Sequence, residues 1–140
     1  MILNINTDGA SRGNPGKASY GIVIKNDEGE ILDTKKDFLG ITTNNIAEYT
    51  GVLEALKLVK NRYNLEKIKK INIISDSELL VKQLNKIYKV KNLNLKKYFD
   101  EIERIKKEFI EKGIEVSFKH VKREYNKEAD ALANEVLDNI

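Results

Sequence analysis

The sequence predicts an α/β fold in which five strands form one mixed sheet flanked by helices. Three strand-like segments come first and are joined by short turns, and two more follow, each after a segment of helical periodicity. Strands joined by hairpins run antiparallel, whereas a helical crossover leads to a parallel strand. Strands 1–3 are therefore expected to be antiparallel, and strands 4 and 5 to run parallel to strand 1.

The five strands are expected where short apolar runs end in turn residues. Asn26-Asp27-Glu28-Gly29 is a turn signal between the second and third strands, so these two form a hairpin. Asp8 is expected to end the first strand and to open a loop. The fourth strand is a short apolar run, and the fifth alternates apolar and polar residues. The expected strands are residues 2–8, 19–26, 30–38, 71–75 and 114–121.

Helices are expected where apolar residues recur at intervals of three and four. This periodicity extends over residues 46–59 and again over residues 95–109, where Gly113 ends the second helix. A shorter helix is expected over residues 77–85, and Asn126 is expected to cap a closing helix. The helices therefore supply the crossovers that the parallel strands require.

Composition indicates a soluble globular protein with a single domain, residues 1–140. Hydrophobic residues make up 41% of the chain and charged residues 34%, which permits a core of ordinary size. No apolar run approaches the roughly 20 residues of a membrane span, and no signal-peptide pattern opens the chain. The absence of cysteine excludes disulfides and thiolate chemistry. We expect a cytoplasmic monomer with no membrane partner, and the first Met and the terminal helix favour a free-standing protein.

Four acidic residues occupy positions from which they can form one site. Asp8 and Asp76 each follow an apolar strand, and open α/β sheets place their sites at the carboxyl ends of parallel strands. Glu48 and Asp130, in the first turns of the first and last helices, can complete the cluster. Two carboxylates ~5 Å apart repel by roughly 3 kcal/mol at an effective dielectric near 20, so clustering indicates a bound cation. Mg²⁺ prefers carboxylate oxygens and shares its other positions with phosphate, as in two-metal phosphodiester cleavage.

Four sequence blocks contain these acids: DGASRGNPG, TNNIAEY, SDS and NKEADALAN. In this order and at these separations they resemble the signature of type 1 ribonuclease H, the ribonuclease HI family, from about Leu3 to Asn134. One block alone is a weak signal, but four in order are specific. The resemblance implies a ribonuclease H-like fold and an endonuclease that hydrolyses the RNA strand of RNA–DNA hybrids, leaving 5′-phosphate and 3′-hydroxyl ends.

The resemblance also implies catalytic and metal-binding roles for all four acids. Asp8 is expected to contact both of two Mg²⁺ ions held with substrate, with Mn²⁺ as an alternative cofactor. Glu48 is expected to contact metal and the 2′-hydroxyl beside the scissile phosphate, a contact that distinguishes RNA from DNA. Asp76 and Asp130 would complete the two coordination shells.

The same blocks and a lysine-rich stretch supply the expected substrate contacts. Alternative interpretations are a simple turn after the first strand, helix caps for the Thr, Asn and Ser residues, and a solvated basic surface for the lysines. The lysine-rich stretch, residues 79–99, contains six lysines and no acid, which suits phosphate contacts. The residues expected to bind substrate are Gly9, Ala10, Ser11, Arg12, Gly13, Asn14, Thr43, Asn44, Asn45, Ser77, Lys86, Lys89 and Arg123.

The chain departs from the best-known family pattern at two places. Between Lys82 and Leu95 there is no room for the additional helix called the basic protrusion, which the lysines replace only in part. Between the last strand and Asn126, the family often has a glycine-rich loop with a histidine, and here only Lys122–Tyr125 remains. The sequence therefore resembles a compact variant that lacks both features.

His120, the only histidine, is not expected to replace the loop histidine. It shares one face of an alternating strand with Val116 and Phe118, which favours a core-facing or strand-end structural role. Arg123 or Glu124, in the shortened loop, is better placed to contact phosphate or to relay a proton.

Three other functions compete with this interpretation. The first is a non-catalytic module that binds hybrid or double-stranded RNA, which would be indicated by the loss of an acid. The second is another nuclease of this architecture, such as a proofreading-type 3′–5′ exonuclease or a resolvase. The exonuclease needs an Asp-x-Glu pair where this chain has Asp8-Gly9-Ala10. The third is a ribonuclease H domain that depends on a partner polymerase.

Overall fold

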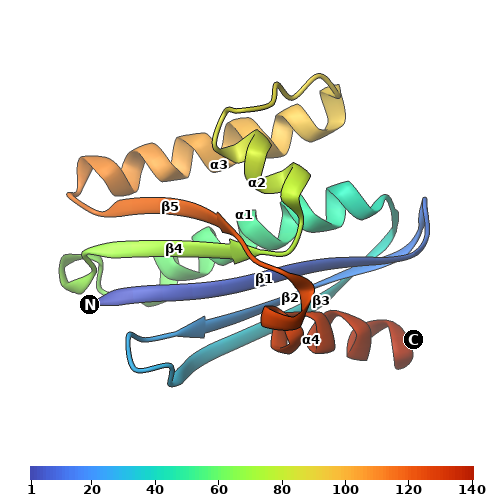
Figure 1. The fold of residues 1–140 in the computed structure, drawn as a ribbon, viewed down its shortest axis with the longest axis horizontal. Helices are drawn as coiled ribbons and strands as arrows, with labels where there is room; N and C mark the ends of the chain where they lie inside the picture. The colour runs from blue at the N-terminus through green and yellow to red at the C-terminus, as the bar shows by residue number, and fades with distance from the viewer.

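The computed structural model describes residues 1–140 and contains one mixed sheet of five strands (Figure 1). The strands are β1 (Ile2–Gly13), β2 (Gly16–Lys25), β3 (Ile31–Thr42), β4 (Lys70–Ser75) and β5 (Glu115–His120). Their order is β3-β2-β1-β4-β5, so β1 lies at the centre of the sheet. The first three strands pair antiparallel, whereas β4 is parallel to β1 and β5 is parallel to β4. The topology predicted from the sequence is confirmed.

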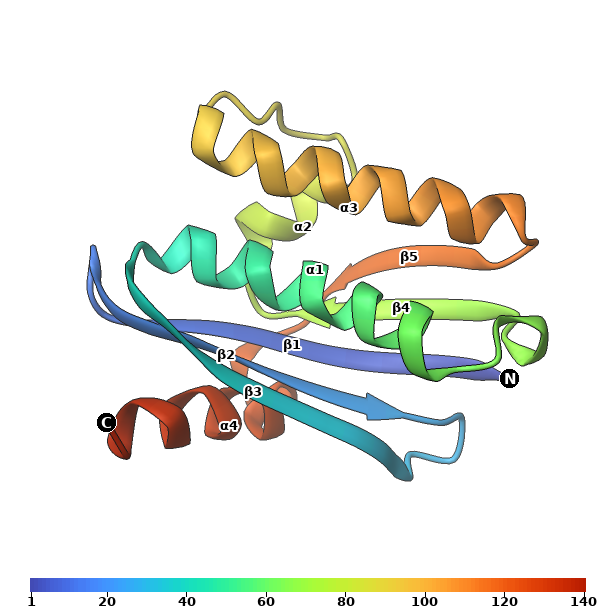
Figure 2. The ribbon, with the colours of Figure 1, turned by 180° about the vertical axis from the view of Figure 1, so that it is seen from behind.

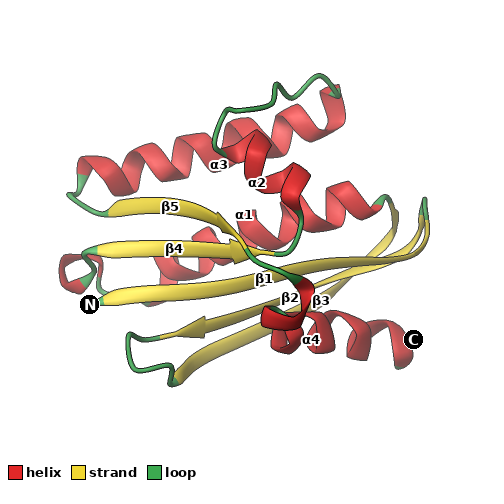
Figure 3. Ribbon diagram, in the orientation of Figure 1, coloured by secondary structure: helices red, strands yellow, loops and turns green.

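Four helices flank the sheet, three on one face and one on the other (Figure 2, Figure 3). They are α1 (Asn44–Arg62), α2 (Glu78–Leu84) and α3 (Leu93–Glu111) on the first face, and α4 (Lys127–Asp138) on the second. The side chains of Thr43, Ser77 and Asn92 cap the first three helices by accepting hydrogen bonds from main-chain N–H groups. None of the helices combines the length and apolar character needed to cross a membrane.

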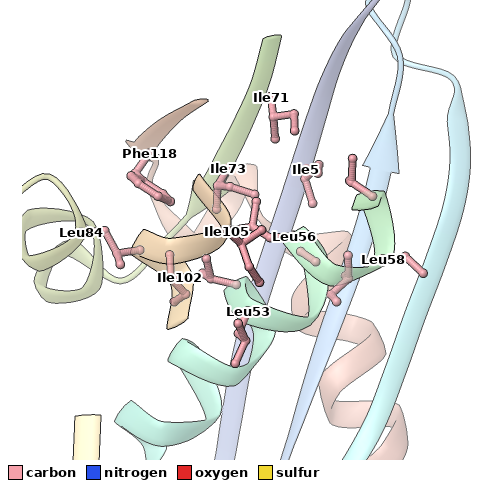
Figure 4. Close-up of a cluster of buried hydrophobic side chains, with 14 of the residues drawn as sticks. Ile5, Leu53, Leu56, Leu58, Ile71, Ile73, Leu84, Ile102, Ile105 and Phe118 are labelled. Carbon is pink, nitrogen blue, oxygen red and sulfur yellow. The ribbon is translucent and has the colours of Figure 1, made fainter. Parts of the chain in front are cut away.

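The hydrophobic core lies between the sheet and the layer formed by α1 and α3 (Figure 4). Alternate side chains of the central strands point into this layer, so Ile5 of β1 and Ile73 of β4 are buried. Leu56 of α1 and Ile102 of α3 belong to the same cluster. Burial of each such side chain contributes roughly 1.5–3 kcal/mol. The core therefore fixes α1, the helix that contains Glu48, on the sheet.

The first hairpin is longer than the sequence predicts. Asp8 was expected to open a loop, but β1 continues to Gly13 and pairs with β2 from Asp8↔Gly21 to Gly13↔Gly16. The polar residues of this segment lack the alternation of a half-buried strand, so only the pairing with β2 defines the element. Gly13 has a φ of 104° at the turn, a conformation that favours glycine. Asp8 consequently lies within a strand.

Asn126 occupies the N-cap position of α4 but does not cap it with its side chain, contrary to the prediction. Its Nδ2 donates a hydrogen bond of 2.9 Å to the carbonyl oxygen of Thr7, and its Oδ1 accepts one of 3.0 Å from Asn6 Nδ2. The side chain is thus engaged by β1 instead of by the helix. This contact fixes the start of α4 beside the strand that contains Asp8.

Two connections are short, as the sequence predicts for a compact variant. No helix lies between Leu84, the last residue of α2, and Leu93, the first of α3. Between β5 and α4 the only regular structure is the 3-10 turn η2 (Arg123–Tyr125). Another 3-10 turn, η1 (Leu65–Lys67), precedes β4.

Candidate active site

Asp8 and Asp76 lie close together because β1 and β4 are parallel and in register. Asn6 pairs with Ile74, so each acid stands two residues beyond the same paired position. β1 continues past this position beside β2, whereas β4 ends at Ser75. The two acids therefore meet at the carboxyl end of β4, as predicted.

Glu48 reaches Asp8 because α1 packs tightly on the main chain of β1. A Cβ atom added to Gly9 would lie 2.3 Å from the Glu48 nitrogen and 2.4 Å from the Ala47 carbonyl carbon, so no side chain fits there. The Gly9 N–H donates a hydrogen bond to the Glu48 carboxylate. Glu48 lies just beyond the first turn of α1, which is slightly later than the sequence predicts.

Asp130 approaches Asp8 from the helix on the other face of the sheet. Gly21 of β2 pairs with Asp8, and a Cβ atom added to Gly21 would lie 2.3 Å from the Ala129 carbonyl oxygen. The main chain of α4 therefore packs directly on β2 at this position. Asp130, in the first turn of α4, comes within hydrogen-bond reach of Asp8 as a result.

The four acids line one open, polar cavity of about 390 Å³. Asp8, Glu48 and Asp76 each offer one carboxylate oxygen, and these three oxygens lie within 4.8 Å of one another. Asp8 and Glu48 are both only 5% exposed. The fold thus brings together all four acids that the sequence singles out. The other lining residues are Gly9, Ala10, Ser11, Asn44, Arg123 and Asn134.

Burial and mutual repulsion make ionisation of these carboxyl groups unfavourable. Burial, followed by the charges of Glu48 and Asp76, raises the pKa of Asp8 to about 9. Burial and the charge of Asp76 raise the pKa of Glu48 to about 8, although the hydrogen bond from Gly9 acts in the opposite direction. A cation among these groups would favour their ionised forms.

The donor set fits a hard divalent cation. All candidate ligands are carboxylate oxygens, and none of the four acids forms an ion pair with a Lys or Arg side chain. Glu48 Oε2 is buried and has no hydrogen-bond partner in the protein. A buried polar atom without a partner is costly, and a cation bound at this oxygen would supply the missing partner. Oxygen-only coordination of this kind is typical of Mg²⁺ and similar ions.

Comparison with known proteins agrees with this geometry. A family model described as reverse transcriptase-like matches residues 6–136. The chain is 36% identical to the ribonuclease H of Clostridium botulinum (strain Hall), in a match that covers 96% of this chain and 94% of that protein. The crystal structure of LC11-RNase H1 in complex with RNA/DNA hybrid superposes with a TM-score of 0.88 at 38% identity, covering 98% of this chain and 97% of that one. The chain belongs to the type 1 ribonuclease H family.

Some relatives of this chain are much longer, and the chain spans about a third of their length. The bifunctional protein Rv2228c of Mycobacterium tuberculosis is 34% identical over 99% of this chain, but the match covers only 36% of that protein. The structure of the N-terminal RNase H domain of rv2228c has a TM-score of 0.86 and 33% identity, over 99% of this chain. The present chain therefore corresponds to the ribonuclease H domain of that relative.

Half of the six substrate residues predicted in the first hairpin border the acidic cavity. Gly9, Ala10 and Ser11 line it directly. Asn14, near the hairpin turn, accepts a hydrogen bond of 3.0 Å at Oδ1 from the main-chain N–H of Asn44. Its amide NH₂ group forms no hydrogen bond within the protein and is available to a ligand. The other three predicted hairpin residues, Arg12, Gly13 and Asn14, lie outside the lining of the acidic cavity.

A second, smaller cavity of about 160 Å³ includes two residues that the sequence reasoning missed. Its polar lining comes from Asn14, Thr43, Asn45, Asn92 and Asn94, so the first turns of α1 and α3 face the same space. Helix N-termini present unpaired N–H groups and favour anions. A signal for Asn92 and Asn94 existed in the polar residues at the start of the long amphipathic helix, where a cap is expected.

The predicted lysines lie outside the acidic cavity. Lys86 follows α2, has a φ of 63°, and forms an ion pair of 3.0 Å with Glu103 of α3. Lys89 is exposed in the connection between α2 and α3 and borders a separate pocket beside Tyr88. Lys86, Lys89 and Lys96 of the lysine-rich stretch line this separate pocket together.

Ser77 and His120 occupy the edge of the sheet next to Asp76. Ser77 Oγ accepts a hydrogen bond of 3.3 Å from the Leu80 N–H, so the predicted helix cap is present. His120 is exposed at the end of β5, opposite Ser75 of β4, and does not line the cavity. Of the two structural positions predicted for His120, the structure has the one at the strand end.

Proposed function

We propose that this ribonuclease H is a metal-dependent endonuclease that hydrolyses the RNA strand of RNA–DNA hybrids to 5′-phosphate and 3′-hydroxyl products. The observation that carries the proposal is the group of three carboxylate oxygens within 4.8 Å of one another, together with the unpartnered Oε2 of Glu48. The complex of LC11-RNase H1 with RNA/DNA hybrid, from a protein 38% identical to this one, supports the same substrate. We take residues 1–140 as one catalytic domain that acts as a monomer.

The four acids are the proposed metal ligands, for two Mg²⁺ ions with substrate bound, or for Mn²⁺ in their place. Bound ions of this kind activate a water for in-line attack and stabilise charge on the leaving oxygen. Asp8 is the central ligand, because Glu48 and Asp76 contribute oxygens near its carboxylate and Asp130 lies within hydrogen-bond reach of it. Asp8 would therefore contact both ions, and Asp130 would be a ligand of the second.

Glu48 is proposed to have a second role in the recognition of RNA. Its carboxylate accepts a hydrogen bond from the Gly9 N–H, and the side chain lines the acidic cavity. From this position it would accept a hydrogen bond from the 2′-hydroxyl next to the scissile phosphate. A contact of this type selects ribose over deoxyribose.

The remaining contacts are proposed to come from neutral donors around the cavity. Gly9, Ala10 and Ser11 line the acidic cavity, and Asn14 is held beside the first turn of α1 by the hydrogen bond from the Asn44 N–H. Thr43 and Asn45 lie in the adjoining small cavity, where a second phosphate would meet the N-terminus of α1. Arg123 is the only cationic residue that lines the acidic cavity, and it would contact the phosphate backbone.

A cleavage assay with three labelled substrates tests this function. The protein is incubated with end-labelled RNA–DNA hybrid, double-stranded RNA and single-stranded RNA, each with Mg²⁺ and with EDTA. We expect internal cleavage of the hybrid RNA in Mg²⁺, none in EDTA, and none by Asp76→Asn. Asp100→Asn is the matched control, since Asp100 is a largely exposed acid of α3 outside the acidic cavity.

The competing functions give different outcomes in the same assay. Hybrid binding without cleavage in both Mg²⁺ and Mn²⁺ would indicate a binding module or a domain that needs a partner polymerase. Stepwise shortening of the RNA from one end would indicate an exonuclease. Cleavage of double-stranded RNA at a comparable rate would extend the substrate class beyond hybrids.

A further inference from the structure

Asn134 lines the acidic cavity but has no role in the functions considered so far. It lies on α4 one turn after Asp130, half-buried, and on the same side of the helix. Its Nδ2 donates a hydrogen bond of 3.1 Å to Asp130 Oδ1 and one of 3.0 Å to the Asp130 carbonyl oxygen. The side chain therefore holds both the main chain and the carboxylate of one acid.

A neighbouring residue fixes which way round the Asn134 amide lies. Arg12 Nη2 contacts Asn134 Oδ1 at 3.5 Å and donates a hydrogen bond of 2.5 Å to Asp138 Oδ1. A guanidinium donates and cannot accept, so it selects the orientation in which the amide oxygen faces Arg12. The NH₂ group then faces Asp130. The hydrogen bonds run in one direction, from the Arg12 guanidinium through Asn134 to the Asp130 carboxylate.

The chemistry of an amide suits this position. An Arg or Lys at residue 134 would form an ion pair with Asp130 and compete with a cation for the carboxylate. A neutral NH₂ group occupies one lone pair of Oδ1 and leaves the charge of the carboxylate available. It also restricts the rotation of the Asp130 side chain, which is only half-buried.

We propose that Asn134 is a positioning residue that orients Asp130 as a metal ligand, and that Arg12 sets the orientation of the Asn134 amide. The proposal rests on the proposed function, because it concerns the ion that Asp130 would hold. Partners that orient the ligands of a metal are worth about 10–100-fold in metal affinity. Arg12 was expected from the sequence to contact substrate, and in this proposal it acts through Asn134 instead.

The test compares Asn134→Ala with the wild type in two measurements. The first is the Mg²⁺ concentration that gives half-maximal cleavage of hybrid, which we expect to rise about tenfold while KM for the hybrid stays unchanged. The second is calorimetric titration of the substrate-free protein with Mn²⁺, in which we expect weaker binding. Asn134→Gln keeps an amide donor on the same turn and should recover most of the affinity. Arg12→Ala should give a smaller loss of the same kind.

A double variant separates action through Asp130 from an independent role. If Asn134 acts through Asp130, then Asp130→Asn combined with Asn134→Ala should lose no more Mn²⁺ affinity than Asp130→Asn alone. Asn139→Ala is the matched control, because Asn139 Nδ2 donates a similar helix bond, of 2.7 Å to the Glu135 carbonyl oxygen, outside the cavity. Circular dichroism verifies that each variant is folded. Folding is expected, because Ala has the highest helix propensity.

Each of the other outcomes overturns the assignment. An unchanged Mg²⁺ requirement, or a rise in KM alone, would make Asn134 a structural or substrate-contacting residue. Fully additive losses in the double variant would mean that Asn134 does not act through Asp130. If the wild type cleaves no substrate, the proposed function fails separately and the Mn²⁺ titrations still decide, since unchanged Mn²⁺ binding in Asp130→Asn would leave Asn134 no ligand to position.

Discussion

Gly9 and Glu48 are in direct main-chain contact across the interface between β1 and α1. The position of a Cβ atom on Gly9 lies 2.3 Å from the Glu48 nitrogen, and the Gly9 N–H donates to the Glu48 carboxylate. Because Asp8 is the preceding residue, the same contact that allows the helix to approach the strand also sets the separation of two acids. The active-site geometry is therefore built into the packing of the core.

Replacement of Gly9 by Ala should disturb both the fold and the site. We expect Gly9→Ala to lower the free energy of unfolding by about 3 kcal/mol, because the added methyl group meets main-chain atoms that cannot move aside locally. Cleavage should fall more than stability explains, since α1 must shift with Glu48. Denaturant unfolding and cleavage rates measure the two effects.

Gly51→Ala is the control for this substitution. Gly51 lies within α1, where an added Cβ would be 3.5 Å from Tyr20 Cβ, an ordinary van der Waals contact. Ala is favoured over Gly in a helix interior by roughly 0.5–1 kcal/mol, so this variant should be as stable as the wild type or more stable. A large loss of stability in both variants would mean that α1 tolerates no added volume, and that the Gly9 contact is not special.

Asp76→Asn should separate catalysis from stability. The substitution removes one charge from a cluster in which neighbouring carboxylates ~5 Å apart repel by roughly 3 kcal/mol. The metal-free variant should therefore melt at the same temperature as the wild type or higher, while Mg²⁺-dependent cleavage is lost. Destabilisation of the metal-free protein by several kcal/mol would identify Asp76 as a structural residue.

The stability of the metal-free protein should fall as the pH rises. The pKa of Asp8 is raised from 3.8 to about 9 and that of Glu48 from 4.5 to about 8, so between these limits the native state binds more protons than the unfolded state. The stabilisation is complete below the unfolded values and is lost as the pH passes through the folded values. Thermal melting in EDTA should therefore show a higher midpoint at pH 6 than at pH 9.

Added Mg²⁺ should reverse this pH dependence. Metal binding requires ionised carboxylates, so its stabilising effect grows with pH. Asp8→Asn serves as the control, because it removes the larger of the two raised carboxyl pKa values and should flatten the dependence in EDTA. A midpoint in EDTA that rises from pH 6 to pH 9 would contradict the burial and repulsion described for the cluster.

Lys86→Gly should stabilise the protein. Lys86 has a φ of 63°, a left-handed conformation that costs roughly 1–2 kcal/mol for a residue with a Cβ atom and that glycine adopts freely. Loss of the partly exposed ion pair with Glu103 offsets about 0–1 kcal/mol of this gain. We expect a net increase of about 0.5–1 kcal/mol, measured by denaturant unfolding. Lys86→Ala, which keeps the strain and loses the ion pair, should be less stable than the wild type.

The same pair of variants tests whether Lys86 of the lysine-rich stretch contacts substrate. If Lys86 contacts substrate phosphate, both Lys86→Gly and Lys86→Ala should weaken hybrid binding and lower its dependence on salt by the same amount. Equal affinity and salt dependence in the variants and the wild type would mean that Lys86 does not contact substrate and has only a structural role in the loop.

The sequence predicted the topology and the meeting of the four acids because both depend on local patterns. Asp8 and Asp76 each follow an apolar run, and parallel pairing of those runs is enough to align them. It did not predict the extension of β1 beyond Asp8, since this polar segment pairs only with β2 and has no distinctive alternation. Gly21 was also missed, because the need for a glycine arises only when α4 packs across β2.

The hydrogen bonds between side chains were the part of the site that the sequence predicted least well. Asn126 was correctly placed at the start of α4. Its hydrogen bonds with Asn6 and Thr7 were not predicted, because these partners are 120 and 119 positions away in the sequence. Asn134 lies four residues after Asp130, and this spacing alone could have suggested a hydrogen bond within the helix. The role of Arg12 could not be foreseen, because its partners lie at the far end of the chain.

The most direct test of the central claim is the cleavage of an end-labelled RNA–DNA hybrid by the wild type and by Asp8→Asn, in Mg²⁺ and in EDTA. The clustered acids predict internal cleavage of the RNA strand by the wild type in Mg²⁺ only, and none by Asp8→Asn in either condition. Cleavage that persists in EDTA, or that Asp8→Asn retains at the wild-type rate, would contradict the assignment of this cluster as the metal-dependent active site.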